Sequence, residues 1–378
     1  MLRENRTRKG EERMETVRAV VLRGMGGPLN MEILRMEGPR DDEVLVSVVA
    51  SGICHTDIDL CDDWDEETGP VVLGHEGAGI VEKTGGKVEG VVPGDRVVLS
   101  YQSCGLCPPC RAGRPFACLR FFEANFGFRR LDGSNALERS GVRGHFFGQS
   151  SFADRSLATE RNLVKVPGDL HLEMLAPLGC GMQTGAGTVM NALAVRPGQG
   201  IAVFGTGAVG LAAVMAARIA GARPVVGVDV LPRRIALALE LGATHGIDGR
   251  REDVRSRIGD IAGRGVHYVI DTTGDPGLAR IAAAVLRPGG TAAFLAGTGA
   301  PASLPGGRKA VEIIQGNAVP QRFIPEMISW HRSGRFPFDR LVKFYDFGDI
   351  DRAVADAKRG DTIKPVLRWS GRGERKDS

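Results

Sequence analysis

Four closely spaced cysteines offer the clearest chemistry in the sequence, and they are Cys104, Cys107, Cys110 and Cys118. Gaps of two residues let consecutive thiolates turn back onto one ion, and the longer last gap closes the fourth corner of the tetrahedron that zinc prefers. Zinc held by four thiolates has no open position, so the spacing predicts a structural site. Disulfides or unmodified thiols are the plain alternative, but CxxC-type doublets favour a metal. A zinc ribbon that binds nucleic acid is a second interpretation.

Three further residues, Cys54, His75 and Cys180, are candidates for a second metal site. They lie far apart in the sequence, so their spacing alone proves little. Two thiolates and one imidazole would leave the fourth zinc position open for water or substrate, as a catalytic site requires.

A glycine-rich motif at 205–210 has the spacing of a dinucleotide-binding turn. It follows the apolar run 201–204 and opens an alanine-rich helix, and Asp229 lies 19 residues beyond its last glycine. The glycines allow the backbone to approach a pyrophosphate, which the helix N-terminus attracts. We expect Asp229 to bind ribose hydroxyls and repel a 2′-phosphate, which favours NAD over NADP. The other residues that we assign to the cofactor here are Gly205, Gly207, Val209, Gly210 and Arg234.

The elements that must position these residues change character along the chain. Residues 1–15 are mostly charged and lack an apolar period, which predicts a disordered extension. Short strands punctuated by glycine follow, among them 17–22 and 44–50, as in a β-barrel. From residue 201 strands and helices alternate, which predicts βαβ units and a parallel sheet. We expect a barrel-like domain at 16–181, a doubly wound α/β domain at 182–320, and a return to the first domain at 321–378.

The composition is that of an ordinary globular protein, with 43% hydrophobic and 25% charged residues in 378. A net charge of +4 gives no general case for a nucleic-acid or membrane partner. No apolar run approaches the roughly 20 residues needed to span a bilayer, and we see no signal peptide. Seven clustered cysteines favour a reducing compartment, so we expect a cytoplasmic location.

Phenylalanine is concentrated between residues 119 and 150, which hold six of the fifteen in the chain. The six are Phe121, Phe122, Phe126, Phe128, Phe146 and Phe147. They could form a local hydrophobic cluster under a long loop, or they could line a pocket for an apolar substrate.

Several motifs occur in the order that is typical of one enzyme family. They are Gly74-His75-Glu76, the four-cysteine cluster, residues 179–185 and residues 205–210. Together they resemble the zinc-dependent alcohol dehydrogenases, which are medium-chain dehydrogenase/reductases, over nearly all of 17–368. Segments 144–152 and 178–187 are similar to aryl-alcohol (benzyl-alcohol) dehydrogenases. The resemblance implies a GroES-like β-barrel catalytic domain and a Rossmann coenzyme domain.

The same resemblance implies where the catalytic zinc binds. Its ligands would be Cys54, His75 and Cys180, with Glu76 beside them. Asp57 matches the acid that orients the zinc histidine.

Roles in proton transfer and cofactor binding are implied in the same way. Thr56 matches the hydroxyl that takes the alcohol proton, and Asp59 stands where many relatives place the histidine that ends the proton relay. Thr184 matches a residue that packs against the nicotinamide. His55 and Lys364 match positions that contact the cofactor phosphates.

We therefore expect an enzyme with two zinc ions per chain that oxidises a primary alcohol, aryl or allylic, by hydride transfer to NAD. A thiol-adduct formaldehyde dehydrogenase of the same superfamily is the alternative, although the phenylalanine-rich segment disfavours its polar pocket. The zinc-ribbon interpretation leaves Cys54, His75 and Cys180 unexplained. We expect no nucleic-acid or membrane partner, and a homodimer or homotetramer as in the relatives.

Overall fold

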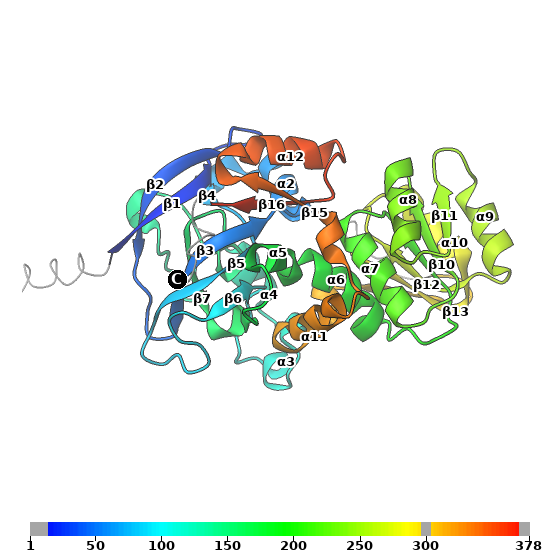
Figure 1. Ribbon diagram of the computed structural model, residues 1–378, viewed down its shortest axis with the longest axis horizontal. Helices are drawn as coiled ribbons and strands as arrows, with labels where there is room; N and C mark the ends of the chain where they lie inside the picture. Colours follow the sequence, from blue (N-terminus) through cyan, green and yellow to red (C-terminus); the bar gives the residue numbers. More distant parts are fainter. Residues whose placement is uncertain (1–13, 296–303, 370–378) are drawn as a thin grey trace, which may run out of the picture. The chain divides into compact units, whose positions relative to one another are not determined.

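A computed structural model of the protein describes residues 14–295 and 304–369 (Figure 1). The chain forms two compact units. The first unit combines the residues up to Cys180 with those from Leu341 onwards, and the second consists of Gly181–Arg340. The first and the last of the described residues thus belong to the first unit.

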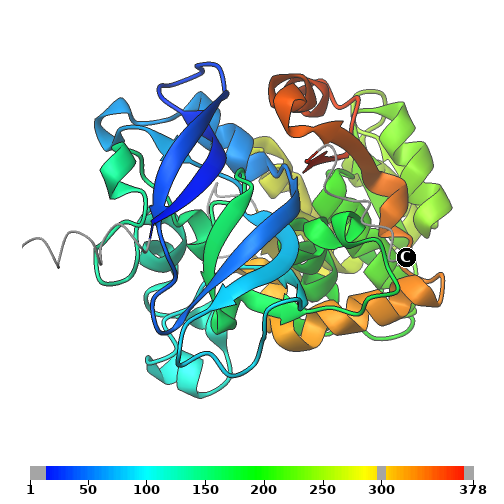
Figure 2. The same cartoon turned by 60° about the vertical axis from the view of Figure 1, so that its left-hand side comes forward.

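The first unit is built mainly of antiparallel strands (Figure 2). A three-stranded sheet has the order β2-β1-β4, and a larger sheet has the order β15-β16-β3-β5-β6-β8, with β7 also paired to β3. The strands are β1 (Met14–Leu22), β2 (Asn30–Glu37), β3 (Glu43–Gly52), β4 (Val71–Val72), β5 (Glu76–Thr84), β6 (Arg96–Leu99), β7 (Arg155–Thr159), β8 (Leu163–Lys165), β15 (Val342–Asp346) and β16 (Lys364–Arg368). The β-rich domain expected from the glycine-punctuated sequence is confirmed.

Short helices join these strands. They are α2 (His55–Asp62), α3 (Pro108–Arg111), α4 (Phe121–Phe126), α5 (Leu172–Leu175) and α12 (Ile350–Lys358). Strand β3 lies between β16 and β5, and its Val44 and Val46 pack in the core with Val81, Val97 and Leu99. Since burial of apolar surface is the main stabilising term, this core holds rigid the strand ends that carry the site.

The second unit is a parallel six-stranded sheet with helices between its strands. Its order is β11-β10-β9-β12-β13-β14, so the chain proceeds to one side of β9 and then crosses to the other. The strands are β9 (Ile201–Phe204), β10 (Val225–Asp229), β11 (His245–Asp248), β12 (Val266–Asp271), β13 (Leu286–Phe294) and β14 (Lys309–Glu312). Its helices are α6 (Gly181–Gly187), α7 (Ala208–Ile219), α8 (Pro232–Leu241), α9 (Val254–Ala262), α10 (Pro276–Val285) and α11 (Pro320–Arg332). This is the predicted doubly wound α/β fold, in which ligands bind at the carboxyl ends of strands where the order reverses.

Two expected boundaries differ from the structure. Strand β1 begins at Met14, where it pairs with Glu37 of β2, so residues 14 and 15 are not part of a disordered extension; residues 1–13 lie outside the described residues. The second unit continues past residue 320 to Arg340, because α11 packs on α6 of the same unit. Within 14–295 and 304–369, no helix is long and apolar enough to cross a membrane.

Candidate active site

One cluster in the first unit brings together the three separated metal-ligand candidates. Cys54 immediately precedes α2, His75 lies just before β5, and Cys180 follows the 3-10 turn Ala176–Gly179. Their ligand atoms and a carboxylate oxygen of Glu76 all lie within 4.8 Å of one another. Folding therefore produces a local donor set that the spacing in the sequence could not establish.

The imidazole of His75 has one ring nitrogen bound and the other without a partner. Asp57 Oδ1 lies 3.0 Å from Nδ1, and Asp57 also accepts hydrogen bonds from the backbone N–H groups of Cys54 and Gly74. Nε2 is buried and has no hydrogen-bond partner within the described residues. Because buried polar groups are almost always satisfied, an orphaned nitrogen facing two thiols indicates a missing ligand such as a metal ion.

The chemistry of the donor set fits zinc. The hydrogen bond from Cys180 and the nearby His75 hold the pKa of the Cys54 thiol well below its usual range, which favours the thiolate that binds metals. Burial alone lowers the pKa of His75, but the carboxylate of Asp57 and the neighbouring Cys54 together raise it to about 10. Two thiolates and one imidazole leave one tetrahedral position for a substrate.

Glu76 lies beside this donor set and is paired with Lys364. Both carboxylate oxygens lie 2.9 Å from the Lys364 ammonium, which also donates to the carbonyl of Ile53 at 3.1 Å. A Cβ at Gly52 would lie 2.1 Å from Glu76 Oε2, so only glycine leaves room for this carboxylate. Burial raises the pKa of Glu76, while the charge of Lys364 lowers it. The ammonium of Lys364 thus lies beside Glu76, and its contact with the cofactor phosphates stays a prediction.

Residues of α2 place a hydroxyl next to the cluster and charged groups at the surface. Thr56 Oγ1 lies 3.9 Å from Cys54 Sγ. His55 and Asp59 are one helical turn apart, with 3.6 Å between His55 Nε2 and Asp59 Oδ1, and both side chains are exposed. This arrangement offers a hydroxyl close to the donor set and titratable groups in contact with water.

An aromatic wall covers one side of His75. The ring of Phe147 stacks on the imidazole with centroids 4.5 Å apart, and Phe146 meets its edge at 5.2 Å. Phe126 packs against both of these rings, Phe128 stacks on Phe146, and Trp64 packs against Phe128. Phe146 and Phe147 are buried and contact the imidazole of His75, while Phe122 of the same phenylalanine-rich segment is 67% exposed.

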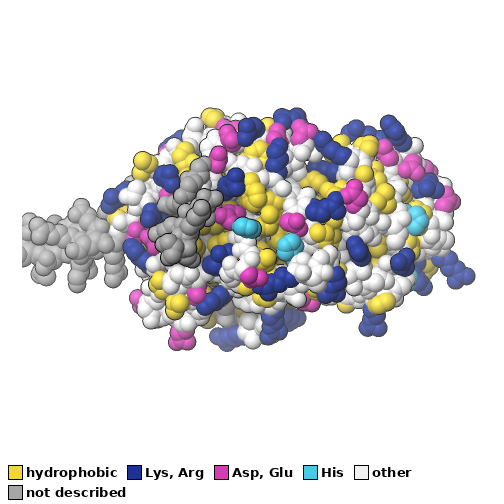
Figure 3. Space-filling view, viewed as in Figure 1, with side chains coloured by type: hydrophobic (Ala, Val, Ile, Leu, Met, Phe, Trp, Pro, Cys, Tyr) yellow, Lys and Arg dark blue, Asp and Glu magenta, His cyan; other side chains and the backbone are white. Residues whose placement is uncertain are grey.

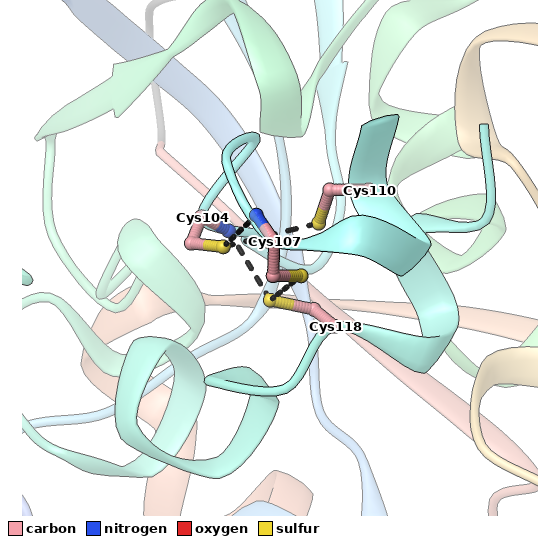
Figure 4. A group of neighbouring side chains, drawn as sticks. All are labelled: Cys104, Cys107, Cys110 and Cys118. Carbon is pink, nitrogen blue, oxygen red and sulfur yellow. Dashed lines mark hydrogen bonds between the residues drawn. The ribbon is translucent and has the colours of Figure 1, made fainter. Parts of the chain in front are cut away.

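The second cluster consists of the four closely spaced cysteines (Figure 4). Their sulfur atoms all lie within 4.8 Å of one another, and two pairs are 4.0 Å apart. A tetrahedral zinc site with Zn–S bonds of about 2.3 Å requires sulfurs roughly 3.8 Å apart. The backbone N–H groups of Cys104 and Cys107 donate to sulfurs of the cluster. The geometry fits a closed site with four thiolate ligands.

In the second unit, the glycine motif forms the turn between β9 and α7. Gly205 has φ of +82°, and a Cβ there would lie 2.5 Å from Thr272 Oγ1. A Cβ at Gly210 would lie 1.9 Å from the carbonyl oxygen of Gly205. Both positions therefore require glycine. Gly207 precedes the first turn of α7, so the N–H groups that a phosphate would need are at this turn.

Asp229 ends β10 beside this turn, and its carboxylate is held in place. Oδ2 accepts from the N–H and the hydroxyl of Thr206 at 2.7 and 3.0 Å, while Oδ1 accepts from the N–H groups of Val230 and Leu231. Arg234 lies near Gly207, with a guanidinium nitrogen 3.8 Å from where a Cβ would stand. Val209 is in the first turn of α7 and Thr184 is in α6 of the same unit.

Sequence reasoning missed one residue and one contact of the first unit. Gln149, which hydrogen-bonds the backbone of His75, was given no role, and the pairing of Lys364 with Glu76 was not foreseen. A glutamine that closely follows two consecutive phenylalanines was the signal, because a buried amide needs several partners.

Two family models match the chain. One is described as an alcohol dehydrogenase GroES-like domain and matches residues 40–168; the other is described as a zinc-binding dehydrogenase and matches residues 208–322. A geraniol dehydrogenase from Castellaniella defragrans is 46% identical over 364 residues, which cover 93% of this chain and 97% of that protein.

Solved structures agree with these matches. The crystal structure of an alcohol dehydrogenase zinc-binding domain protein from Burkholderia ambifaria is 48% identical, with a TM-score of 0.90, and the match covers 94% of this chain and 99% of that one. A benzyl alcohol dehydrogenase from Acinetobacter calcoaceticus is 40% identical, also with a TM-score of 0.90, covering 94% and 100%. The chain therefore belongs to the zinc-dependent alcohol dehydrogenases of the medium-chain dehydrogenase/reductase family. The resemblance seen in the sequence and the two-domain fold it implied are confirmed.

Proposed function

We propose that this enzyme converts an aryl or allylic primary alcohol reversibly into its aldehyde, with NAD⁺ as the hydride acceptor and one proton released. The observation that carries the proposal is the buried, partnerless Nε2 of His75 between two thiols and against the ring of Phe147. Such a site combines a metal donor set with an apolar wall, which is what an uncharged alcohol with a large hydrocarbon group requires.

Residues of the first unit have distinct roles in this proposal. Zinc held by Cys54, His75 and Cys180 would supply Lewis acidity that lowers the pKa of an alcohol hydroxyl. Asp57 keeps the proton of His75 on Nδ1, so that Nε2 is free to act as a ligand. Thr56 Oγ1 accepts the alcohol proton.

The proton must then leave the site, and two exposed groups on α2 are placed to pass it to water. His55 and Asp59 form a pair at 3.6 Å on the helix that carries Thr56. Asp59 replaces the histidine that many relatives have at this position, so we propose that the exposed pair completes the proton path.

The second unit supplies the cofactor site in this proposal. The turn at 205–210 would bind the pyrophosphate, with Arg234 nearby, and Asp229 would bind the adenosine ribose. The carboxylate of Asp229 disfavours a 2′-phosphate, so we propose NAD rather than NADP. Thr184 is assigned to packing against the nicotinamide.

The aromatic wall supports a substrate with a ring or a conjugated double bond. Burial of apolar surface contributes about 25 cal/mol per Å², and an aromatic ring buries far more surface than the two carbons of ethanol. Relatives named geraniol dehydrogenase and benzyl alcohol dehydrogenase act on an allylic and an aryl alcohol, in agreement with such a wall.

A panel of alcohols with NAD⁺, followed by NADH absorbance, tests this proposal. We expect kcat/KM for benzyl alcohol and geraniol to exceed that for ethanol by about 100-fold or more. Similar values for ethanol and benzyl alcohol would remove the aryl or allylic assignment. Activity only with the adduct of formaldehyde and a thiol, and with none of the free alcohols, would instead favour the formaldehyde dehydrogenase alternative.

We also propose that the four-cysteine cluster holds a second, structural zinc and does not bind nucleic acid. Of the arginines near it, Arg120 pairs with Glu123 and Arg130 with Glu43 and Glu37. Acidic and basic side chains are interspersed on the visible face in Figure 3. Binding to DNA that weakened steeply with salt would support the zinc-ribbon interpretation instead.

For the assembled protein, we propose a homodimer or homotetramer in the cytoplasm. Strand β14 is the last strand in the order of the six-stranded sheet, and a strand at the end of a sheet can pair with a strand of another chain. The mass of the native protein in solution, measured by light scattering, tests the oligomeric state; a monomer would contradict it.

A further inference from the structure

The stretch that carries His75 belongs to no strand. Residues 73–75 lie between β4 and β5, so their backbone groups need partners outside a regular sheet. The carbonyl oxygens of residues 72–75 each accept a hydrogen bond from segment 149–152. The four pairs are Val72 with the Ser150 hydroxyl, Leu73 with the Phe152 N–H, Gly74 with the Ser151 N–H, and His75 with the side-chain amide of Gln149.

Gln149 makes the most extensive of these contacts. Its Nε2 donates to the carbonyls of His75 and Ser100 at 2.9 and 3.1 Å, and its Oε1 accepts from the N–H of Gly77 at 3.1 Å. The side chain is 2% exposed. A Cβ at Gly77 would lie 3.0 Å from Oε1, so glycine makes room for the amide. One amide thus fixes the backbone on both sides of Glu76.

The same segment also fixes the ring of His75. Phe147 stacks on the imidazole with an interplanar angle of 27°. Phe147 has φ of 52°, and His145 and Ser150 also have positive φ, which is unfavourable for side chains other than glycine. Such conformations persist where the surrounding contacts impose them. Segment 145–152 therefore keeps a costly backbone conformation that places Phe147 and Gln149 on His75.

We infer that Gln149 is a positioning residue for the metal site: through the backbone of His75 it sets where Nε2 points. The inference rests on the proposed metal site at Cys54, His75 and Cys180. Asp57 fixes the ring nitrogen Nδ1, and Gln149 fixes the main chain from which the ring extends. Gln149 acts through His75 and touches neither Cys54 nor Cys180 in any hydrogen bond of the described residues.

Metal binding of Gln149→Met tests this inference, because methionine has a similar length and no amide. Outer partners of metal ligands typically contribute about 10–100-fold to metal affinity. We expect a loss of that size at the catalytic site, measured by competition with a chelator, while the four-cysteine site keeps its metal. With Co²⁺ in the catalytic site, the visible absorption bands should shift.

Asn125→Leu is the matched control. Asn125 is fully buried in α4 and also makes three hydrogen bonds, to the backbone of Gln102 and Phe121, but none to segment 145–152 or to His75. We expect it to lose stability and to keep the wild-type cobalt spectrum and metal affinity. An equal spectral shift in Asn125→Leu would show that any buried amide has this effect, and would overturn a specific role of Gln149.

Two further results decide the inference. Wild-type affinity and spectrum in folded Gln149→Met would overturn it, whereas a wild-type protein that binds no metal at this site would overturn the proposed function instead. If Gln149→Met does not fold, Ser156→Ala takes its place, since the Ser156 hydroxyl binds the Gln149 carbonyl. A smaller spectral shift in that variant supports the inference, and unchanged bands contradict it.

Discussion

Asp57 Oδ1 lies 3.0 Å from His75 Nδ1, and both side chains are almost completely shielded from solvent. The same carboxylate accepts hydrogen bonds from the backbone N–H groups of Cys54 and Gly74. A single acid therefore sets the tautomer of one candidate ligand and the backbone of another. Asp57 is therefore tied to two of the three candidate ligands, Cys54 and His75.

Asp57→Asn should weaken zinc binding at the catalytic site by about 10–100-fold, because the amide cannot stabilise the imidazole as a carboxylate does. Zinc competition with a chelator measures this effect. The four-cysteine site is the internal control and should be unaffected. Equal zinc affinity in Asp57→Asn and wild type would contradict the role of Asp57.

Thr56→Ala should reduce kcat by about 100-fold or more, while Thr56→Ser should reduce it little, because proton transfer needs only the hydroxyl. Steady-state kinetics with benzyl alcohol provides the measurement. The apparent affinity for NAD⁺ serves as a control and should be similar in both variants. If Thr56→Ser and Thr56→Ala reduced kcat equally, the site would require the methyl group of Thr56 and not its hydroxyl.

Asp229→Gly should raise kcat/KM for NADP⁺ relative to NAD⁺. The substitution removes the negative charge that repels a 2′-phosphate and leaves Arg233 and Arg234 close by. The ratio of the two kcat/KM values is the readout. A wild-type enzyme that used both cofactors equally would already refute the assigned preference.

His145 gives the protein a pH-dependent stability. Burial, and then the charges of Arg130 and Arg40, lower the pKa of His145 to about 3, against the opposing effect of Asp132. The unfolded chain takes up this proton near pH 6.5, so stability falls as pH drops from about 6.5 towards 3, by up to about 1.4 kcal/mol per pH unit.

His145→Asn removes this group and tolerates the positive φ at this position. Denaturant unfolding between about pH 6 and 4.5 should show a shallower loss of stability than in wild type. The comparison of slopes cancels effects that both proteins share, such as metal loss in acid. Parallel slopes would mean that His145 titrates normally in the folded state.

Local patterns in the sequence predicted the parts of the fold that local geometry determines. The spacing of Cys104, Cys107, Cys110 and Cys118 and the glycine motif at 205–210 each specify a turn within one segment, and the structure has both. The alternation of strands and helices likewise predicted the parallel sheet, because the period of the apolar residues is visible within each strand or helix.

Contacts between distant segments could not be predicted in this way. Gln149 and His75 are 74 residues apart, and Lys364 and Glu76 are 288 apart. Neither pair follows a periodic pattern, and each depends on how loops cross after the sheets have formed. No local pattern showed that the Lys364 ammonium pairs with the buried carboxylate of Glu76, although a buried charge requires such a partner.

The zinc content of Cys180→Ser tests the central claim most directly. Cys107→Ser is the control, because it removes a ligand of the four-cysteine site and should cost stability along with that zinc. Elemental analysis should find two zinc ions per chain in wild type and one in Cys180→Ser, which should remain folded and lose turnover. Wild-type zinc content and turnover in Cys180→Ser would contradict a catalytic zinc site at Cys54, His75 and Cys180.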